Sequence, residues 1–458
     1  MTTTAADSTW RLAVAPGAVP LLGHSRQLRS DPLGFLGSLS DHGDIVVVKF
    51  GPSPVHMLTR HDYAHHLLVE RAKEFRRGGP FFERSRTIMG NGLATARGAE
   101  HRRQRRLTQP AFHNNHIHTY GAAMQAEVDA LVGGWQPGQR IDILQAVHDL
   151  TTRVTLRCFF SADTEDTESL EIVSEAAAAL DGLIGGMYRQ MTAPIAAMAK
   201  LPTKANRRYR EYVERFHRAV DKIIAAQRGN EERSDVLGLL MSAKDPETGT
   251  SFTDEELHDQ VITFLAAGID TTANTIAWAL GLLAAHPEVR EKFHAEIDSV
   301  VGDRPACEVD VRELTYTRSV LDETLRLYPP LWTMTREAIE QVRIGGHDFP
   351  AGTQFGVSPY ALQRDSRVFD EPARFDPDRR TRQPNIPRTA VIPFGAGVHK
   401  CIGDGFAIME ACIALGTIAQ RWELALTEES TPLRPLTLMT LGPASVTVVA
   451  APRTRVTS

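Results

Sequence analysis

The chain has 458 residues, a formal net charge of −5 and a hydrophobic fraction of 42%, which is enough for two or three average domains or for one large single-core protein. This acidic total gives no general reason to bind nucleic acid or an anionic membrane. The four cysteines show no CxxC pair and no disulfide-like density, so they indicate neither a zinc site nor a disulfide framework and fit a reducing, cytoplasmic setting.

The N-terminal stretch has neither the regions of a signal peptide nor an apolar run long enough to span a bilayer, so we expect a cytoplasmic protein without a membrane partner. Its Pro and Gly content predicts an extended segment over residues 1–30. Repeats, low-complexity tracts and a dividing polar linker are all missing from the sequence. We therefore predict a single domain over residues 1–458.

Strand signals stand near both ends of the chain, and helical periodicity fills most of the sequence between them. Two β-branched runs between residues 44 and 60 surround Gly-Pro-Ser-Pro, a pattern typical of a hairpin. The stretch PASVTVVAA near the C-terminus predicts another strand. The sequence therefore predicts a mainly α fold with a small β part.

A basic run, EHRRQRR, occupies residues 100–106 and places His101 and Arg105 four residues apart, on one face of a helix. Such a run is typical of a solvated helix face or of a nucleic-acid patch. The acidic total charge weighs against nucleic acid.

The longest predicted helix begins at Thr253, which has the spacing of a capping box with Glu256, and ends before Pro287. At 1.5 Å per residue it is about 50 Å long, enough to cross a whole domain. A membrane span is disfavoured because Asp270 lies at its middle, where an ionisable group is costly in lipid. We therefore predict a helix that crosses the core.

Asp270 and Thr271 lie among apolar residues, where polar groups cost free energy unless they are hydrogen-bonded or hydrated. In one interpretation Thr271 bonds back to the carbonyl of Ala267, Gly268 permits a local bend, and Asp270 caps a neighbouring group. In the other, a loosened turn at Ala267 and Gly268 makes room for a small ligand such as dioxygen. The Asp270 and Thr271 side chains then hold waters that deliver protons.

Glu323 and Arg326 in LDETLRLYPP share one helical face and can form an ion pair. An ordinary surface pair is one interpretation. The flanking leucines indicate a packed helix instead, in which a buried arginine needs a bidentate partner and further acceptors. Arg379 in FDPDR could join that cluster.

Cys401 lies in FGAGVHKCIG (394–403), directly before an apolar helical run from Asp404 to Trp422. A helix N-terminus stabilises negative charge, so we expect this thiol to ionise more easily than a free one. Thiolate is a soft ligand that suits haem iron, and the three glycines would let the backbone pass close to a bulky planar group. A small buried hydrophobe, a nucleophile and a redox thiol are the alternatives.

The motifs AAGIDTT (266–272), Glu323-x-x-Arg326, FDPDR (375–379) and FGAGVHKCIG stand in an order that resembles the cytochrome P450 family, and the resemblance covers nearly the whole chain. It implies the single-domain cytochrome P450 fold, with a long central helix over haem b (iron protoporphyrin IX). Cys401 would be the metal ligand.

The resemblance also implies roles for the other candidate residues. Asp270 and Thr271 would be the acid-alcohol pair that delivers protons, and Glu323, Arg326 and Arg379 a buried structural cluster. An outward face of the basic run would dock an acidic electron carrier through Arg102, Arg103 and Arg106. Further residues are expected to bind the cofactor, most of them by contacting its propionates or by lining its site. The full set is His101, Arg105, Ala267, Gly268, Arg336, Phe394, His399 and Cys401.

A family member of this kind is a monooxygenase that uses O2, with electrons from NAD(P)H through a ferredoxin and a ferredoxin reductase. Its thiolate ligand favours cleavage of the O–O bond and oxidation of an unactivated C–H bond. The segments expected to cover the haem are apolar, namely 78–93, 180–188, the start of the long helix, 331–334 and 437–440. They predict an apolar small-molecule substrate without a charged anchor.

Segments such as VPLLGH, HRRQRRLTQPAF and LIGGMYRQM resemble bacterial members that oxidise sesquiterpenes, which indicates a terpenoid substrate from secondary metabolism. A fatty acid, a steroid and a macrolide are alternative substrates. A peroxide-driven fatty-acid hydroxylase is disfavoured because such relatives lack the acid-alcohol pair. A non-catalytic haem gas sensor and a scaffold without cofactor are rival functions.

Overall fold

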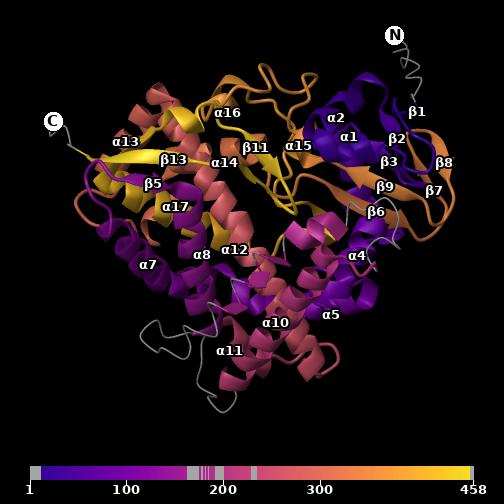
Figure 1. Cartoon of the computed structure of the whole chain (residues 1–458), viewed down its shortest axis with the longest axis horizontal. Coiled ribbons are helices and arrows are strands. Elements are labelled where there is room, and N and C mark those ends of the chain that lie inside the picture. The colour runs from indigo at the N-terminus through magenta and orange to yellow at the C-terminus, as the bar shows by residue number, and fades with distance from the viewer. Residues whose placement is uncertain are drawn as a thin grey trace, which may run out of the picture.

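The computed structural model describes residues 12–161, 175–176, 179–180, 182–183, 185–190, 201–227 and 235–453. Helices make up most of the molecule, and the largest sheet lies to one side of them, with helix α12 (Asp254–Ala285) running through the middle (Figure 1). The predicted fold class, mainly α with a small β part, is confirmed.

The remaining helices vary from one turn to twenty-four residues. They are α1 (Ser25–Ser30), α2 (Pro32–Ser38), α3 (His61–His65), α4 (Pro80–Met89), α5 (Gly98–Thr108), α6 (Asn114–Ile117), α7 (Gly121–Gly133), α8 (Ile143–Phe160), α10 (Lys204–Gln227), α11 (Val236–Ser242), α13 (Pro287–Val300), α14 (Thr315–Leu327), α15 (Pro359–Leu362), α16 (Arg379–Arg382) and α17 (Asp404–Arg421).

The strands form one six-stranded sheet, in the order β1-β2-β3-β9-β6-β4, one of three strands, in the order β10-β13-β5, and two hairpins, β7-β8 and β11-β12. They are β1 (Leu12–Val14), β2 (Ile45–Phe50), β3 (Ser53–Leu58), β4 (Phe75–Arg76), β5 (Arg140–Asp142), β6 (Met334–Ala338), β7 (Val342–Ile344), β8 (His347–Phe349), β9 (Gln354–Val357), β10 (Trp422–Leu426), β11 (Pro435–Thr437), β12 (Leu441–Pro443) and β13 (Thr447–Pro452).

Both strand predictions are confirmed. Strands β2 and β3 pair as an antiparallel hairpin, and Gly51 adopts a positive φ of 59° in the turn between them. Near the C-terminus β13 pairs with β10 and β5. The six-stranded sheet brings β6, and with it Arg336, beside β4.

Helix α12 crosses the core as predicted. The Thr253 hydroxyl accepts from the Glu256 N–H at 3.2 Å, while the Glu256 carboxylate accepts from the Thr253 N–H at 2.8 Å, so the capping box is complete. Helices α8, α14 and α17 pack against α12. Its middle therefore lies deep in the molecule, where a polar side chain must have partners.

Helix α17 begins directly after the Cys401 segment and ends one residue before Trp422, which starts β10. The predicted apolar run forms this helix, and its apolar residues include the buried Phe406, Ile408, Met409, Cys412, Ile413 and Leu415. Because α17 is packed between α7, α12 and α14, it fixes the loop before it at the edge of the core.

The expected N-terminal extended segment is described from Leu12 onward. In that part, β1 pairs with β2 in parallel, and residues Ser25–Ser30 form helix α1 rather than extended chain. The Asp31 side chain then accepts from the Gly34 N–H at 2.9 Å and caps α2. Among the described residues, no helix combines the length and the apolar character that a membrane span requires.

Candidate active site

The segment that carries Cys401 is a tight turn held by its own backbone. The Cys401 N–H donates to the Phe394 carbonyl at 2.9 Å, and the Lys400 N–H donates to the Gly397 carbonyl at 3.0 Å. Gly395 and Gly397 have φ values of 71° and 67°, in the left-handed region that favours glycine. The glycine-rich sequence is therefore what allows this turn to form.

The three glycines differ in what surrounds them. A Cβ on Gly397 would lie 2.0 Å from the Leu68 carbonyl oxygen, so Gly397 packs against the protein itself and not against a planar ligand. At Gly395 and Gly403 the nearest heavy atom to such a Cβ lies at 3.8 Å. Only Gly395 and Gly403 leave room for a neighbouring group. The prediction that all three glycines let the backbone pass close to a planar group is therefore wrong for Gly397.

The expectation that Cys401 ionises easily is wrong for the protein alone. Burial raises the pKa of the thiol, and the opposing effects of the Gly403 N–H, Arg105 and Lys400 are smaller. Cys401 nevertheless keeps solvent-accessible surface. Desolvation outweighs the helix terminus here, and a cation bound directly to the sulfur would favour the thiolate.

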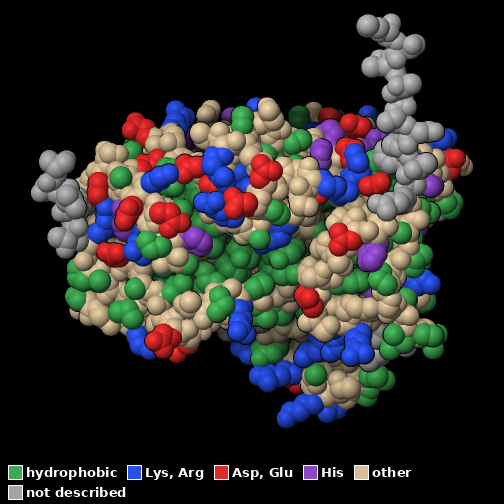
Figure 2. Space-filling model, turned by 90° about the horizontal axis from the view of Figure 1, so that it is seen from above, with side chains coloured by type: hydrophobic (Ala, Val, Ile, Leu, Met, Phe, Trp, Pro, Cys, Tyr) green, Lys and Arg blue, Asp and Glu red, His purple; other side chains and the backbone are tan. Residues whose placement is uncertain are grey.

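An open patch interrupts the buried middle of α12. Ala267 is exposed, and Ala266, Gly268 and Thr271 are half-buried, although the residues on either side, Leu265 and Thr272 among them, are buried. Side chains on a core-crossing helix are accessible only where a hollow lies against them. A hollow with hydrophobic walls is visible on the face of the molecule shown in Figure 2.

The expected loosening of α12 at Ala267 and Gly268 is not observed. The helix is regular through this turn, and the Thr271 hydroxyl donates to the Ala267 carbonyl at 2.7 Å, as in the first of the two interpretations. A Cβ on Gly268 would lie 3.3 Å from Thr155 on α8. The open space beside α12 therefore follows from the small side chain of Ala267 and not from a broken helix.

Two histidines from distant parts of the sequence meet beside the cysteine segment. Nε2 of His101, on α5, lies 3.2 Å from Nδ1 of His399, and the centroids of the two rings are 4.2 Å apart. Burial, together with neighbouring guanidinium groups, lowers the pKa of His101 to about 3 and that of His399 to about 2. Both rings are therefore neutral near pH 7 in the protein alone.

Three arginines surround these histidines. Arg105 donates to the Lys400 carbonyl at 2.7 Å, Arg336 to the Thr335 carbonyl at 2.8 Å, and Arg77 to the Leu93 and Ala94 carbonyls at 2.8 and 2.6 Å. Burial and mutual repulsion lower the pKa of Arg77 to about 9, and burial lowers that of Arg336 to about 10.

Within the described part of the chain, no carboxylate forms an ion pair with any of these three arginines. Buried cations normally carry a counter-charge, since an uncompensated charge costs several kcal/mol, on the order of 3–5 kcal/mol when its partner is removed. The cluster of His101, Arg105, Arg336, His399 and Arg77 therefore fits an anionic ligand. The two propionates of haem, placed next to a cysteine, meet that requirement.

Arg77 was not predicted from the sequence. It follows Arg76, whose guanidinium pairs with Glu337 at the surface, and no motif in EFRRGG marks either arginine as a ligand-binding residue. The alternation of side chains along β4 was the available signal, because Phe75 is buried and Arg76 is exposed.

Asp270 and Thr271 are not bonded to each other. The Asp270 carboxylate lies 3.0 Å from His148 Nε2 on α8 and also accepts from the Thr440 hydroxyl. Thr440 in turn accepts from the Asn274 amide at 3.0 Å. The acid thus belongs to a polar network between α12, α8 and the loop before β12, and neither His148 nor Thr440 was predicted.

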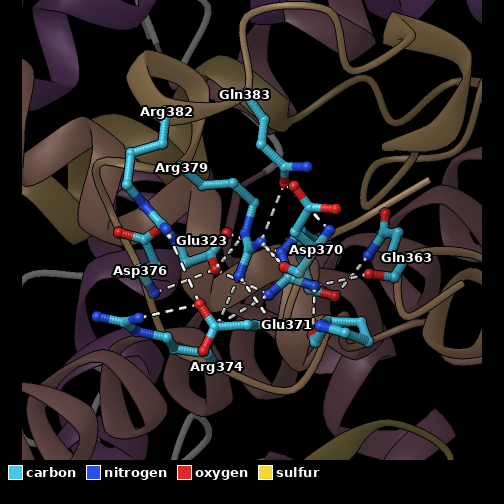
Figure 3. Close-up of polar contacts among 11 residues, drawn as sticks. Glu323, Gln363, Asp370, Glu371, Arg374, Asp376, Arg379, Arg382 and Gln383 are labelled. Carbon is cyan, nitrogen blue, oxygen red and sulfur yellow. Dashed lines mark hydrogen bonds and ion pairs between the residues drawn. The ribbon is translucent and has the colours of Figure 1, made fainter. Parts of the chain in front are cut away.

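Glu323 on α14 is the centre of a fully buried ionic cluster, as predicted (Figure 3). Arg326 binds its carboxylate with two hydrogen bonds, of 2.7 and 2.8 Å, and Arg379 adds a third of 3.0 Å. Their side chains are 3–5% exposed. Other N–H groups of the same two guanidinium groups donate to backbone carbonyls. Arg326 donates to the carbonyls of Gln363, Pro372 and Arg374, and Arg379 to those of Asp370, Glu371 and Arg374.

The outward basic face expected on α5 is smaller than predicted. Arg102 is exposed, but Arg103 pairs with Glu256 at 2.6 Å and Arg106 pairs with Asp245 at 2.8 Å. These ion pairs tie α5 to the start of α12 and to the loop before it. Arg102 alone of the three keeps the exposed position that docking requires.

The segments expected to cover the haem are only partly described. Leu180, Leu183 and Met187 are buried, while the other positions of 180–188 lie partly outside the described residues. Segments 331–334 and 437–440 meet, since Trp332 Nε1 donates to the Leu438 carbonyl at 3.1 Å. Their contact places two of the apolar segments side by side.

The helical fold, the exposed turn of α12, the cysteine before α17 and the cation cluster fit a protein that binds haem. The sequence model of the family "Cytochrome P450" matches residues 15–449. The chain belongs to the cytochrome P450 family.

The chain is similar over most of its length to enzymes of Streptomyces. It is 40% identical to "Cyclooctatin synthase" of Streptomyces melanosporofaciens over 97% of the chain and 96% of that protein. It is 41% identical to "Cyclooctat-9-en-7-ol 5-monooxygenase" of the same organism, over 91% and 90%. It is 38% identical to "Pentalenene oxygenase" of Streptomyces avermitilis, over 94% and 95%. The chain is therefore a cytochrome P450 monooxygenase with a haem cofactor, and it takes O2, a hydrophobic substrate and electrons from a redox partner.

Proposed function

We propose that this monooxygenase inserts one oxygen atom from O2 into an apolar terpenoid of secondary metabolism. The haem assignment depends on the arginines around His101 and His399, for which the described residues provide no carboxylate partner. The hydrogen bond from Arg105 to the Lys400 carbonyl joins this cluster to the cysteine segment. The terpenoid class is supported by the names of the three relatives and by the apolar covering segments.

Each group of residues has a role in this proposal. Cys401 would ligate the haem iron, and His101, Arg105, Arg336, His399 and Arg77 would hold the propionates. Phe394, half-buried and bonded through its carbonyl to the Cys401 N–H, keeps the cysteine loop in place. When bound, the haem supplies the activation of dioxygen for insertion into a C–H bond.

The residues of α12 supply space and protons. The small side chain of Ala267 leaves the helix surface open where dioxygen would fit, while Gly268 lets α12 approach Thr155 of α8. Asp270 and Thr271 deliver protons, a function that is typically worth about 10²–10⁴-fold in rate. The Thr271 hydroxyl, which now donates to the Ala267 carbonyl, can rotate to donate into the hollow.

Electrons come from NAD(P)H through a ferredoxin and a ferredoxin reductase, and the exposed Arg102 contributes to docking. We place the protein in the cytoplasm, and its four free cysteines are compatible with a reducing compartment. Charge reversal at Arg102 should slow reduction by ferredoxin and make the rate less sensitive to salt. An unchanged rate would remove Arg102 from the proposal.

A substrate screen tests the central part of the proposal, the oxidation of an apolar terpenoid. Purified haem-loaded protein is titrated with pentalenene, other cyclic terpene hydrocarbons, lauric acid and a steroid, and the spin-state change in the visible spectrum is recorded. The proposal predicts tight spectral binding and an oxygenated product for at least one terpene hydrocarbon. Binding and turnover of only lauric acid or the steroid would contradict it.

A further inference from the structure

Asp270 has two side-chain partners that differ in what they can do with a proton. The Thr440 hydroxyl donates to one carboxylate oxygen and is itself held by the Asn274 amide at 3.0 Å. An amide does not exchange protons near neutral pH, so this branch orients the carboxylate and ends there. His148, 3.0 Å away from the other oxygen, carries the side chain best suited to take up and release a proton in this pH range.

His148 is the more exposed of the two residues: its side chain is 20% exposed, whereas that of Asp270 is 12% exposed. The His148 carbonyl accepts from the Thr151 and Thr152 hydroxyls at 3.2 and 2.8 Å, and the Thr151 hydroxyl also reaches the Ile269 carbonyl at 3.2 Å. The backbone that carries the imidazole is thereby fixed against the residue before Asp270.

We propose that His148 is the residue through which Asp270 exchanges protons with solvent. This inference rests on the proposed function, in which Asp270 delivers protons to the hollow. In the step, the imidazolium N–H bond breaks and an O–H bond forms on the Asp270 carboxylate, which gives a neutral imidazole and a carboxylic acid. The imidazole then regains a proton from a hydronium ion of the solvent, so protons balance and no electrons move.

A simple positioning role would look different from a relay. If His148 only orients Asp270, a glutamine, which keeps a hydrogen-bond donor, should preserve function. If it carries protons, glutamine and alanine should both fail, because neither titrates. The test therefore compares His148→Gln with His148→Ala, and uses Thr440→Val as the matched removal of the other partner.

The assay measures oxygenated product and hydrogen peroxide per NADPH, with pentalenene as the probe and a surrogate ferredoxin and reductase. We expect product formation to fall about tenfold or more in both His148 variants, with a larger solvent deuterium isotope effect and more peroxide. Added imidazole should restore part of the rate in His148→Ala. Wild-type behaviour of His148→Gln would overturn the relay.

A second measurement needs no turnover. In protein labelled with ¹⁵N-histidine, the Nε2 resonance of His148, assigned by its loss in His148→Gln, should shift in Asp270→Asn more than in Thr440→Val. An unmoved resonance would show that the two side chains do not interact, which also overturns the proposal. In the turnover assay, Asp270→Asn distinguishes a failure of the proposed function from a failure of this inference. If Asp270→Asn retains full product formation, the proposed role of Asp270 is wrong. If Asp270→Asn loses product formation while His148→Gln keeps it, only the role of His148 is wrong.

Discussion

Arg336 is a buried arginine on β6, where the described residues provide no carboxylate partner and burial lowers its pKa to about 10. In the apoprotein this charge is unfavourable, and in the haem-loaded protein a propionate would compensate it. The same side chain should therefore have opposite effects on the stability of the two forms.

We predict that Arg336→Leu releases haem faster while leaving the apoprotein as stable as the wild type or more so. A charge-assisted hydrogen bond is worth about 1.5–3 kcal/mol, so haem affinity should fall roughly 10- to 100-fold. Haem transfer to apomyoglobin and thermal unfolding of both forms measure this. Arg102→Leu, at an exposed arginine, is the matched control, and equal haem loss in both variants would contradict the assignment.

Thr271 is the second residue whose role can be isolated. The residue is half-buried, and among the described residues its hydroxyl bonds only within α12, to the Ala267 carbonyl, so its removal should not disturb the fold. Thr271→Ala should keep haem and substrate binding but divert reducing equivalents into hydrogen peroxide, which is measured per NADPH consumed. Thr275→Ala removes the same type of bond, to the Thr271 carbonyl, and should remain coupled. Tight coupling in Thr271→Ala would refute the proton-delivery role.

At the scale of single elements, α14 carries two ion pairs of opposite kinds. Glu323 and Arg326 are buried and fully bonded, whereas Arg318 and Asp322 pair at 3.0 Å with side chains 48% and 41% exposed. Removing one partner of a buried pair leaves an uncompensated charge, while an exposed pair is screened by water.

Glu323→Ala should lower the free energy of unfolding by about 3–5 kcal/mol, since two buried guanidinium groups would lose their carboxylate. Asp322→Ala, one residue earlier on the same helix, should cost about 0.3–0.5 kcal/mol. Urea unfolding of both variants gives the comparison. Similar small losses would show that the cluster around Glu323 is not energetically coupled.

Helix α10 is joined to α12 by a pH-sensitive contact. His258 on α12 lies 3.4 Å from Asp221 on α10 and 3.6 Å from Asp259, and its ring stacks on that of His217 at 5.1 Å. The interaction with the Asp259 carboxylate, together with attraction to Asp221, raises the pKa of His258 above 6.5. The protonated form is therefore favoured in the folded state.

Because the folded-state pKa is raised, this stabilisation is complete below pH 6.5 and is lost as the pH rises through the folded-state value. The protection of α10 amides, after correction for the intrinsic pH dependence of hydrogen exchange, should fall over that interval by an amount equivalent to less than about 1 kcal/mol, since the contact is partly exposed. In His258→Phe the corrected protection should not change over the same interval. Weaker corrected protection at the acid end in the wild type would contradict this assignment.

At the scale of the whole molecule, local signals in the sequence were sufficient for the framework. The capping box of Thr253 and Glu256 and the pair formed by Glu323 and Arg326 involve residues three apart, so helical geometry alone brings them together. The hairpin of β2 and β3 likewise depends on one turn.

Contacts between distant segments could not be derived in this way. Arg77 lies near Arg105 of α5 and Arg336 of β6 although the three are far apart in the sequence, and His148 meets Asp270 only because α8 packs on α12. The pKa of Cys401 was mispredicted for the same reason: the helix terminus is visible in the sequence, but the burial that outweighs it is a property of the folded chain.

The bond between the Cys401 sulfur and haem iron is the claim on which the functional account depends, and the spectrum of the reduced protein with carbon monoxide tests it most directly. The account predicts a coloured protein whose carbonyl complex absorbs at the long wavelength typical of thiolate ligation, and loss of that band in Cys401→His. A colourless protein, or a wild-type carbonyl spectrum like that of a nitrogen-ligated globin, would contradict it.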